Sequence, residues 1–246
     1  MSQTPRPPLR RFAQIVGLLV LAWLALSCVV VIAFRFVPPW TSAMMMERRV
    51  EALVTHEDGF TFRHTWVPWE RISPQVGIAM VAAEDQKFPY HHGFDVDAIQ
   101  DAIDAADEGR RLRGASTISQ QVAKNLFLWN GRSFVRKGLE AWFTVLIETF
   151  WPKQRILEVY MNTVELGNGI YGVGAAAETF YRTSADRLNA TQAARLAAVL
   201  PNPRRFRVDA PSAYVERRTA WIVRQAGQLG GPAYLSRPAP VSGRVR

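Results

Sequence analysis

The sequence predicts a mainly α-helical domain that is preceded by one transmembrane helix. Ile15 to Phe34 is a run of twenty residues without a charge, the length needed to cross the hydrocarbon core of a bilayer. In the rest of the chain, helix start and stop signals recur and no extended run alternates at period two, so helices are favoured over strands. The single cysteine, Cys28, excludes a disulfide framework, and a chain of 246 residues that is 48% hydrophobic can form its own core.

The charges that flank the apolar run predict its orientation. Arg6, Arg10 and Arg11 precede it and Arg35 follows it, so the positive-inside rule places the N-terminus in the cytoplasm. The run is long for a cleaved signal peptide, and it stays apolar after Cys28, where a mature lipoprotein would turn polar. We therefore expect a cytoplasmic tail, an uncleaved transmembrane anchor, one domain outside the cytoplasm and a flexible C-terminal tail, over residues 1–11, 12–37, 38–229 and 230–246 respectively.

The formal net charge of +9 indicates a basic surface. No nucleic-acid-binding motif accompanies the charge, so we expect the phosphates of the membrane, rather than nucleic acid, to lie opposite it. Arginines are concentrated towards the C-terminus, but by themselves they identify no ligand: Arg204, Arg205, Arg207, Arg217 and Arg218.

The first helices after the anchor are predicted from caps and apolar spacing. A methionine-rich segment favours a helix over 42–55, whose apolar side would face either the core or the lipid headgroups. A short apolar helix follows over 73–83, because Ser73 can cap it and Pro74 suits the first helical position.

A polar helix over 95–108 should end at Gly109. The next helix should begin at Ser116 or Thr117, since either hydroxyl can cap it. The remaining helices are expected over 133–151, from Pro152 to about 162, and over 175–181, 191–200 and 214–229. Four glycines between 167 and 174 indicate a turn rather than a nucleotide-binding loop, because no strand precedes them.

Glu84 is the first candidate catalytic residue. It lies at the end of the apolar helix over 73–83, where the negative end of the helix dipole and an apolar wall both raise the pKa of a carboxyl group. A carboxylate with a raised pKa can act as a general base. The alternative is that Glu84 and Asp85 are a solvated helix end.

A polar row lies on the helix that begins near Thr117. Thr117, Gln121 and Lys124 share this row and Gln120 lies beside it. Amides, hydroxyls and an ammonium group are suited to binding sugar hydroxyls and phosphates.

Glu140 is the second candidate. Arg136 and Lys137 precede it by four and three residues, so an ion pair within one helix is one interpretation. The other is a second acidic residue, flanked by cations, that faces the cleft holding Glu84.

Taken together, these segments resemble the peptidoglycan glycosyltransferases, specifically the monofunctional membrane-anchored transglycosylases. The resemblance covers roughly Met44 to Pro203 and rests on five motifs in the family's order. The first two are matched by Glu84, Asp85, Phe88, His91, Gly93 and Asp95, and by Gly114, Ser116, Thr117, Gln120, Gln121, Lys124 and Asn125. The others are matched by Arg136, Lys137 and Glu140, by Arg155, Glu158, Tyr160, Asn162 and Gly167, and by residues 196–203.

The resemblance implies a lysozyme-like helical fold and the polymerisation of lipid II, a disaccharide-pentapeptide on undecaprenyl pyrophosphate, into β-1,4-linked glycan strands with inversion. It implies that Glu84 is the base that deprotonates the acceptor sugar's 4-hydroxyl. It also implies that Glu140 assists at the donor pyrophosphate, either directly or through a divalent cation such as Mg²⁺ or Mn²⁺. No transpeptidase domain is expected after residue 203.

The same resemblance supplies the expected substrate-binding residues. They are Asp85, Lys87, Phe88, His91, Arg113, Ser116, Thr117, Gln120, Gln121, Lys124, Asn125, Arg136, Lys137, Tyr160 and Asn162. Lipid pyrophosphate leaves as a stabilised anion, so a transferase needs cations beside it, and Lys124, Arg136, Lys137 and Arg113 are the candidates.

The expected location is the bacterial inner membrane, with a single span and the catalytic domain in the periplasm. The expected partners are lipid II, the growing lipid-linked strand, the membrane, and other cell-wall synthesis and division proteins. Two other functions remain open from the sequence. One is cleavage of finished glycan by a lysozyme-like site, which would need a carboxylic acid beside the scissile oxygen. The other is a non-enzymatic, membrane-tethered scaffold for cell-wall enzymes.

Overall fold

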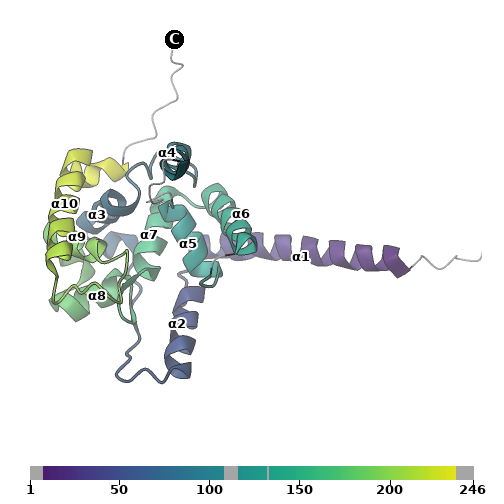
Figure 1. The fold of residues 1–246 in the computed structure, drawn as a ribbon, viewed down its shortest axis with the longest axis horizontal. Coiled ribbons are helices and arrows are strands. Elements are labelled where there is room, and N and C mark those ends of the chain that lie inside the picture. Colours follow the sequence, from purple (N-terminus) through teal and green to yellow (C-terminus); the bar gives the residue numbers. More distant parts are fainter. Residues whose placement is uncertain (1–7, 108–115, 132, 237–246) are drawn as a thin grey trace, which may run out of the picture.

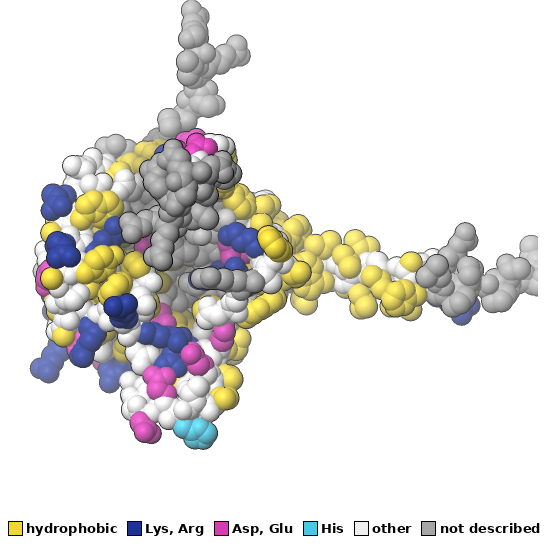
Figure 2. Space-filling view, in the orientation of Figure 1, with side chains coloured by type: hydrophobic (Ala, Val, Ile, Leu, Met, Phe, Trp, Pro, Cys, Tyr) yellow, Lys and Arg dark blue, Asp and Glu magenta, His cyan; other side chains and the backbone are white. Residues whose placement is uncertain are grey.

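The computed structural model describes residues 8–107, 116–131 and 133–236. It shows a helical domain from which one long helix, α1 (Pro8–Phe36), projects on one side (Figure 1). The prediction of a mainly α-helical chain with an apolar N-terminal helix is confirmed. The segment Arg11–Phe36 of α1 contains an 18-residue window with a mean hydropathy of 2.9 and is long and apolar enough to cross a membrane. Its projecting part is almost entirely hydrophobic on the surface (Figure 2).

The last turns of α1 pack against α6 (Phe134–Phe150) and the start of α7 (Lys153–Thr163). Two indoles donate hydrogen bonds to α1: Trp142 Nε1 to Ser27 Oγ at 3.1 Å and Trp151 Nε1 to the Val31 carbonyl at 2.7 Å. Arg155 donates to the carbonyls of Phe34, at 2.8 Å, and Val37, at 3.0 Å. Helix α1 is therefore joined to the domain along its last turns, not only at its end.

The core lies around α3 (Pro74–Glu84), whose residues 76–82 are all buried. Helices α9 (Ala190–Ala198) and α10 (Ala213–Leu229) pack on one side of α3. On the other side, α7 is the central helix, with α5 (Ile118–Phe127) packed on it and α6 packed on α5 (Figure 1). The remaining helices are α2 (Ala43–Val54), which contacts α5, α4 (Val96–Asp107), and α8 (Gly172–Tyr181), which contacts α7.

Polar side chains cap several helices, and the predicted caps, Ser73 at α3 and one of the two candidates at α5, are among them. The side chains of Ser42, Ser73 and Ser133 accept backbone hydrogen bonds at the starts of α2, α3 and α6. Of the two candidates at α5, Thr117 is the N-cap, and it forms a capping box with Gln120. Pro152 precedes α7 directly. Helix positions therefore agree with the predicted ranges to within a few residues.

The structure contains a small three-stranded sheet that the sequence did not predict. Strands β1 (Arg63–His64) and β3 (Ile170–Tyr171) pair in parallel, and β2 (Glu165–Gly167) pairs with β3 in antiparallel fashion. These strands are two or three residues long, too short for an alternating pattern to show. The glycine-rich segment thus forms a hairpin as well as a turn. A side chain at Gly169, where φ is +73°, would collide with the Thr61 carbonyl.

The C-terminal part of the domain extends further than expected. Residues from 230 were expected to be a flexible tail, but Gly231–Ser236 forms a short 3₁₀ helix, η3, that packs on α3. Tyr234 is buried there, and a Cβ at Gly77 of α3 would lie 2.9 Å from the Leu235 side chain. η3 is held by the apolar contact of Leu235 with α3 and by the hydrogen bond of the Tyr234 hydroxyl to the Gln86 carbonyl, and neither residue belongs to a periodic pattern that would have predicted the contact from the sequence.

Candidate active site

Glu84 is the last residue of α3, and its carboxylate faces α5. Gln121 Nε2 donates a 2.9 Å hydrogen bond to Glu84 Oε2, and the Tyr160 hydroxyl donates to Gln121 Oε1 at 3.1 Å. Tyr160 belongs to α7 and is fully buried. Residues from α3, α5 and α7, which lie far apart in the sequence, therefore meet at one carboxylate.

The environment of Glu84 raises the pKa of its carboxyl group above the ordinary value of 4.5. Burial is the main cause, because an apolar surrounding disfavours the charged form, and the negative charge of Asp85 acts in the same direction. The hydrogen bond from Gln121 and the positive charges of Arg218 and Lys124 oppose this rise. The result is a carboxylate that binds a proton more readily than a solvated one, as a general base requires.

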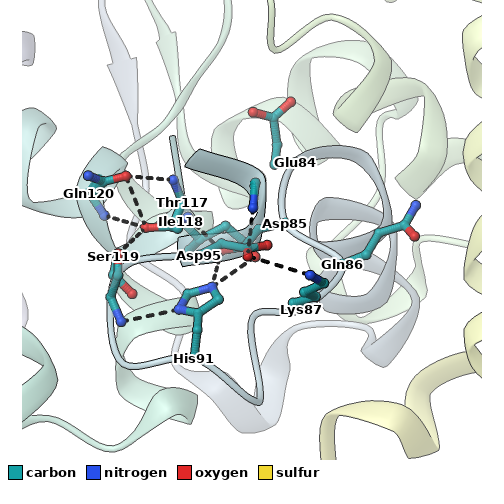
Figure 3. Close-up of polar contacts among 12 residues, drawn as sticks. Glu84, Asp85, Gln86, Lys87, His91, Asp95, Thr117, Ile118, Ser119 and Gln120 are labelled. Carbon is teal, nitrogen blue, oxygen red and sulfur yellow. Dashed lines mark hydrogen bonds and ion pairs between the residues drawn. The ribbon is translucent and has the colours of Figure 1, made fainter. Parts of the chain in front are cut away.

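Asp85, the next residue, has a different role. Its carboxylate accepts hydrogen bonds from His91 Nε2 and from the backbone N–H of Ile118, each at 2.9 Å, and the Asp85 side chain is almost fully buried. Ile118 is the first residue of α5, where free N–H groups favour an anion. Figure 3 shows this cluster and shows Glu84 pointing away from it. Asp85 and His91 thus join the loop after α3 to the start of α5.

Thr117 and Gln120 are also engaged within the protein. The Thr117 hydroxyl donates to the Gly93 carbonyl at 2.6 Å, and Gln120 Oε1 accepts from the Thr117 N–H at 3.0 Å (Figure 3). Both side chains are buried. A side chain at Gly93, where φ is +87°, would lie 2.7 Å from Thr144, so this loop needs glycine to approach α6.

Glu84 borders a hollow of about 190 Å³. Its lining includes Lys87, Asp95 and Ser116, and Lys87 makes ion pairs with Asp95, at 3.6 Å, and with Asp97, at 2.7 Å. A second hollow, of about 150 Å³, is bordered by Gln121 and Lys124. The Glu84–Gln121 hydrogen bond therefore joins a residue that borders the first hollow to a residue that borders the second.

Lys124 connects Glu84 with the start of α6. The pKa of its ammonium group is lowered, chiefly by burial. Lys124 interacts electrostatically with both Glu84 and Glu140, whose negative charges raise its pKa, and with Arg136 and Lys137, whose positive charges lower it. Both acids therefore lie close enough to the half-buried Lys124 to act on it electrostatically.

Glu140 forms the intrahelical ion pairs that its sequence spacing predicts. Arg136 Nη1 donates to Glu140 Oε2 at 2.8 Å, and Lys137 Nζ donates to Glu140 Oε1. The Glu140 side chain is 5% exposed, whereas that of Lys137 is 51% exposed. A third hollow, of about 300 Å³, is bordered by Ser133, Phe134, Arg136 and Lys137. Glu140 therefore lies beneath the two cations, and the cations face the hollow.

The residues around Glu140 do not fit a divalent cation held by the protein. Both carboxylate oxygens already accept hydrogen bonds from positive groups. Across residues 8–107, 116–131 and 133–236, no three His, Cys, Asp or Glu side chains converge as a set of ligands.

The other expected substrate-binding residues have varied positions. Phe88, Asn125 and Asn162 are buried. The Asn162 amide bonds to the backbone of Val67 in both directions, at 2.8 Å, so it fixes the segment before α3 to α7. Ser116 is exposed at the edge of the first hollow. Arg113 lies outside the described residues.

Three residues beside Glu84 were not singled out from the sequence. Arg218 and Gln225 of α10 and Tyr234 of η3 all contact the last turn of α3 or the residue that follows Asp85. Arg218 was noted only as part of a basic C-terminal region, and no spacing in the sequence indicates which of its arginines turns inward.

Comparison with known proteins finds relatives that align with most of the chain. A family model described as "Transglycosylase" matches residues 51–227. The biosynthetic peptidoglycan transglycosylase of Xanthomonas campestris pv. campestris (strain B100) is 56% identical over 235 residues, which cover 95% of this chain and 96% of that protein. The protein of the same description from Chromohalobacter salexigens is 54% identical over 229 residues, covering 93% and 97%. That of Pseudomonas fluorescens is 55% identical over 211 residues, covering 86% and 88%.

Proposed function

The chain belongs to the transglycosylase family, and on that premise we propose that it polymerises lipid II into β-1,4-linked peptidoglycan strands. The observation that carries the proposal is the half-buried Glu84 carboxylate, which has a raised pKa and is hydrogen-bonded to Gln121 of α5, the helix that also carries Lys124. A general base together with the cations Lys124, Arg136 and Lys137 suits the transfer of a sugar from a pyrophosphate to a hydroxyl group.

In the proposed reaction, Glu84 accepts the proton of the acceptor sugar's 4-hydroxyl as the hydroxyl oxygen forms a bond to the donor's anomeric carbon. The bond from that carbon to the pyrophosphate oxygen breaks on the opposite face, so the configuration inverts and undecaprenyl pyrophosphate leaves with the electron pair. The leaving group carries negative charge, and Lys124, Arg136 and Lys137 are the cations that stabilise it.

Glu140 has a supporting role in this proposal. Because it holds Arg136 and Lys137 at the third hollow, it orients the cations instead of touching the reacting atoms. This assignment supposes no protein-held metal ion.

We further propose that α1 anchors the chain in the inner membrane, with the N-terminus in the cytoplasm and the helical domain in the periplasm. The flanking arginines support the orientation, and the length and hydropathy of Arg11–Phe36 support the span. This topology places the domain beside its lipid-linked substrate.

The test is the conversion of labelled lipid II to polymer by the purified full-length protein in detergent. We expect polymer from the wild type and none from Glu84→Gln. Glu178→Gln is a matched control, because Glu178 is exposed on α8, and this variant should polymerise normally. Polymer formation by Glu84→Gln at the wild-type rate would refute the base assignment. Release of soluble muropeptides from sacculi without lipid II would instead favour a cleaving enzyme.

A further inference from the structure

A fourth hollow, of about 740 Å³, lies outside the candidate active site. Three arginines from three elements border it: Arg63 of β1, Arg182 at the end of α8, and Arg187 of the short 3₁₀ helix η2 (Ala185–Arg187). Both β1 and η2 contact α8, so packing brings these arginines together from distant parts of the chain. The border also includes one acid, Glu178, so positive charge prevails there. We call this feature the arginine hollow.

The guanidinium groups at the arginine hollow are unpaired. Among the residues that the structure describes, the side chains of Arg63, Arg182 and Arg187 make no hydrogen bond and no ion pair. The one acid that acts on them noticeably is Asp186, the chain neighbour of Arg187. Elsewhere on the surface arginines do find acids, as Arg195 does with a glutamate at 3.0 Å. The arginine hollow thus gathers positive charge that the protein itself leaves free for a ligand.

Arg182 occupies a backbone position that favours glycine. It follows the last residue of α8 with φ +50° and ψ +42°, the left-handed region, and its N–H donates to the Glu178 carbonyl at 3.1 Å. Helices commonly end in this way on glycine, because a Cβ is unfavourable in the left-handed conformation. An arginine here keeps its side chain at the cost of local strain, and strained residues of this kind concentrate at functional sites.

Hydroxyl groups complete the border of the arginine hollow. Thr179, Thr183 and Ser184 all line it. The Ser184 hydroxyl already interacts with Asp186, but Thr179 Oγ1 has no hydrogen-bond partner among the described residues. Guanidinium groups bind carboxylates and phosphates through paired hydrogen bonds, and hydroxyl groups can add further donors. The chemistry of the border is therefore suited to an anion.

The place of the arginine hollow in the fold narrows the choice of anion. Helix α8 lies on the side of the domain away from the projecting part of α1 (Figure 1), and Lys and Arg side chains are frequent on that side (Figure 2). On the proposed topology this side faces away from the bilayer, so the phosphates of lipid headgroups are out of reach. The strands that peptidoglycan transglycosylases make carry peptides, and these peptides end in carboxylates. A carboxylate-bearing glycan is therefore the anion that this side meets.

We propose that the arginine hollow binds the peptide carboxylates of finished peptidoglycan and so holds the domain against the wall that it extends. Arg63, Arg182 and Arg187 are the residues that contact the carboxylates. The inference goes beyond the proposed function, because polymerisation of lipid II by Glu84 requires no contact with finished strands. It rests on the proposed function only for the topology that places α8 towards the wall.

The test is the binding of the purified full-length protein, in detergent, to isolated sacculi without lipid II. The fraction of protein that pellets with increasing amounts of sacculi gives an apparent affinity. We expect the wild type to pellet, and its binding to weaken as the salt concentration rises, because the contacts join opposite charges.

Arg182→Gly is the most informative variant, because glycine fits the left-handed position without strain. Its Tm should equal or exceed that of the wild type, so weaker binding cannot result from unfolding. We expect the affinity to fall about fivefold for Arg182→Gly and for Arg187→Gln, and roughly 25-fold for the double variant. Arg224→Gln removes an equal charge from an exposed position on α10 and should bind like the wild type.

Sacculi whose carboxyl groups have been converted to neutral amides separate the recognition of carboxylates from that of sugars. They should bind the wild type no more tightly than untreated sacculi bind the double variant. Equal binding of the double variant and Arg224→Gln to untreated sacculi would overturn the inference, as would undiminished binding of the wild type to amidated sacculi. Glu84→Gln should pellet like the wild type, so the failure of this inference and the failure of the proposed function are separate results.

Discussion

Gln121 links Glu84 to Tyr160: its amide nitrogen donates to Glu84 Oε2 at 2.9 Å and its amide oxygen accepts from the Tyr160 hydroxyl at 3.1 Å. Because Tyr160 is fully buried and donates its proton to Gln121, the amide is held with its nitrogen towards Glu84. The orientation of the proposed base is thus set by two hydrogen bonds that lead into the core.

We expect Gln121→Met to lower activity at neutral pH about tenfold, with partial recovery at higher pH. The Gln121 hydrogen bond lowers the pKa of Glu84, so its loss raises that pKa and leaves less of the carboxylate ionised. The measurement is kcat/KM for lipid II at several pH values. An equal loss at every pH would mean that Gln121 acts on substrate binding alone.

The pH profile of the wild-type enzyme should be bell-shaped. Glu84 must be ionised to accept a proton, and its pKa is raised, so the acid limb should lie above the ordinary glutamate value of 4.5. Lys124 must be protonated to stabilise the leaving group, and its pKa is lowered, so the alkaline limb should lie below the ordinary lysine value of 10.5. The acid limb should be absent from the residual activity of Glu84→Gln, if any is measurable.

Replacing Glu140 should release the side chains of Arg136 and Lys137 from the ion pairs that hold them. Glu140→Gln leaves Arg136, whose side chain is 13% exposed, without its counter-ion, so we expect activity to fall about a hundredfold. We expect Arg136→Met to have a similar effect, and the double variant to lose less than the product of the two single losses. Independent, multiplicative losses in this double-mutant cycle would contradict the coupling.

We expect the Glu84 carboxylate to lower the free energy of unfolding at neutral pH. Folding buries its carboxylate, and a raised pKa in the folded state means that the ionised form is disfavoured there. Stability is therefore lost as pH rises through the range between the unfolded and the raised folded pKa. We expect Glu84→Gln to be more stable than the wild type at pH 7, by about 1 kcal/mol, as is common for strained active sites. Thermal unfolding at pH 7 measures this, and at a pH well below 4.5 the difference should shrink.

Arg155 should contribute to the stability of the joint between α1 and the domain. It donates to the carbonyls of Phe34 and Val37 and pairs with Glu158 at 2.8 Å. Arg155→Met should lower the free energy of unfolding by about 2 kcal/mol, because three acceptors lose a charged donor. Arg71→Met, at an exposed position of the short 3₁₀ helix η1 (Trp69–Arg71), is the control and should change stability little. A shift in Tm equal to that of the control would show that the joint contributes nothing.

Much of the fold follows from local signals in the sequence. Two helix starts are specified by neighbouring residues: Ser73 before Pro74 at α3, and Thr117 with Gln120 at α5. The uncharged run before residue 36 likewise predicts the long apolar helix α1. The β2–β3 hairpin and η3 were not predicted, because their formation depends on contacts with residues such as Thr61 and Gly77 that are distant in sequence.

The candidate site was predictable to a smaller degree. Sequence spacing gave the ion pairs of Glu140, since they lie within one helix. The sequence singled out Glu84, which borders a hollow, as the candidate base, but it gave no sign that Asp85, which was expected to bind substrate, is buried against the N-terminus of α5. Arg218 reaches α3 from 135 residues away, a relation that only the packing of α10 on α3 creates.

On the proposed topology, the contact between α1 and α6 sets the depth of the helical domain in the bilayer. Residues 11–22 of α1 are all exposed, and at ~1.5 Å per residue they extend roughly 18 Å, well short of the ~30 Å of a hydrocarbon core. With α1 as the anchor, the turns from Trp23 onward must also lie among acyl chains, and they bring Trp142 and Phe143 with them. On the proposed topology, the domain would therefore be partly submerged in the bilayer, and the lipid-linked sugar proposed as its substrate could reach it by lateral diffusion while its lipid tail stays among the acyl chains.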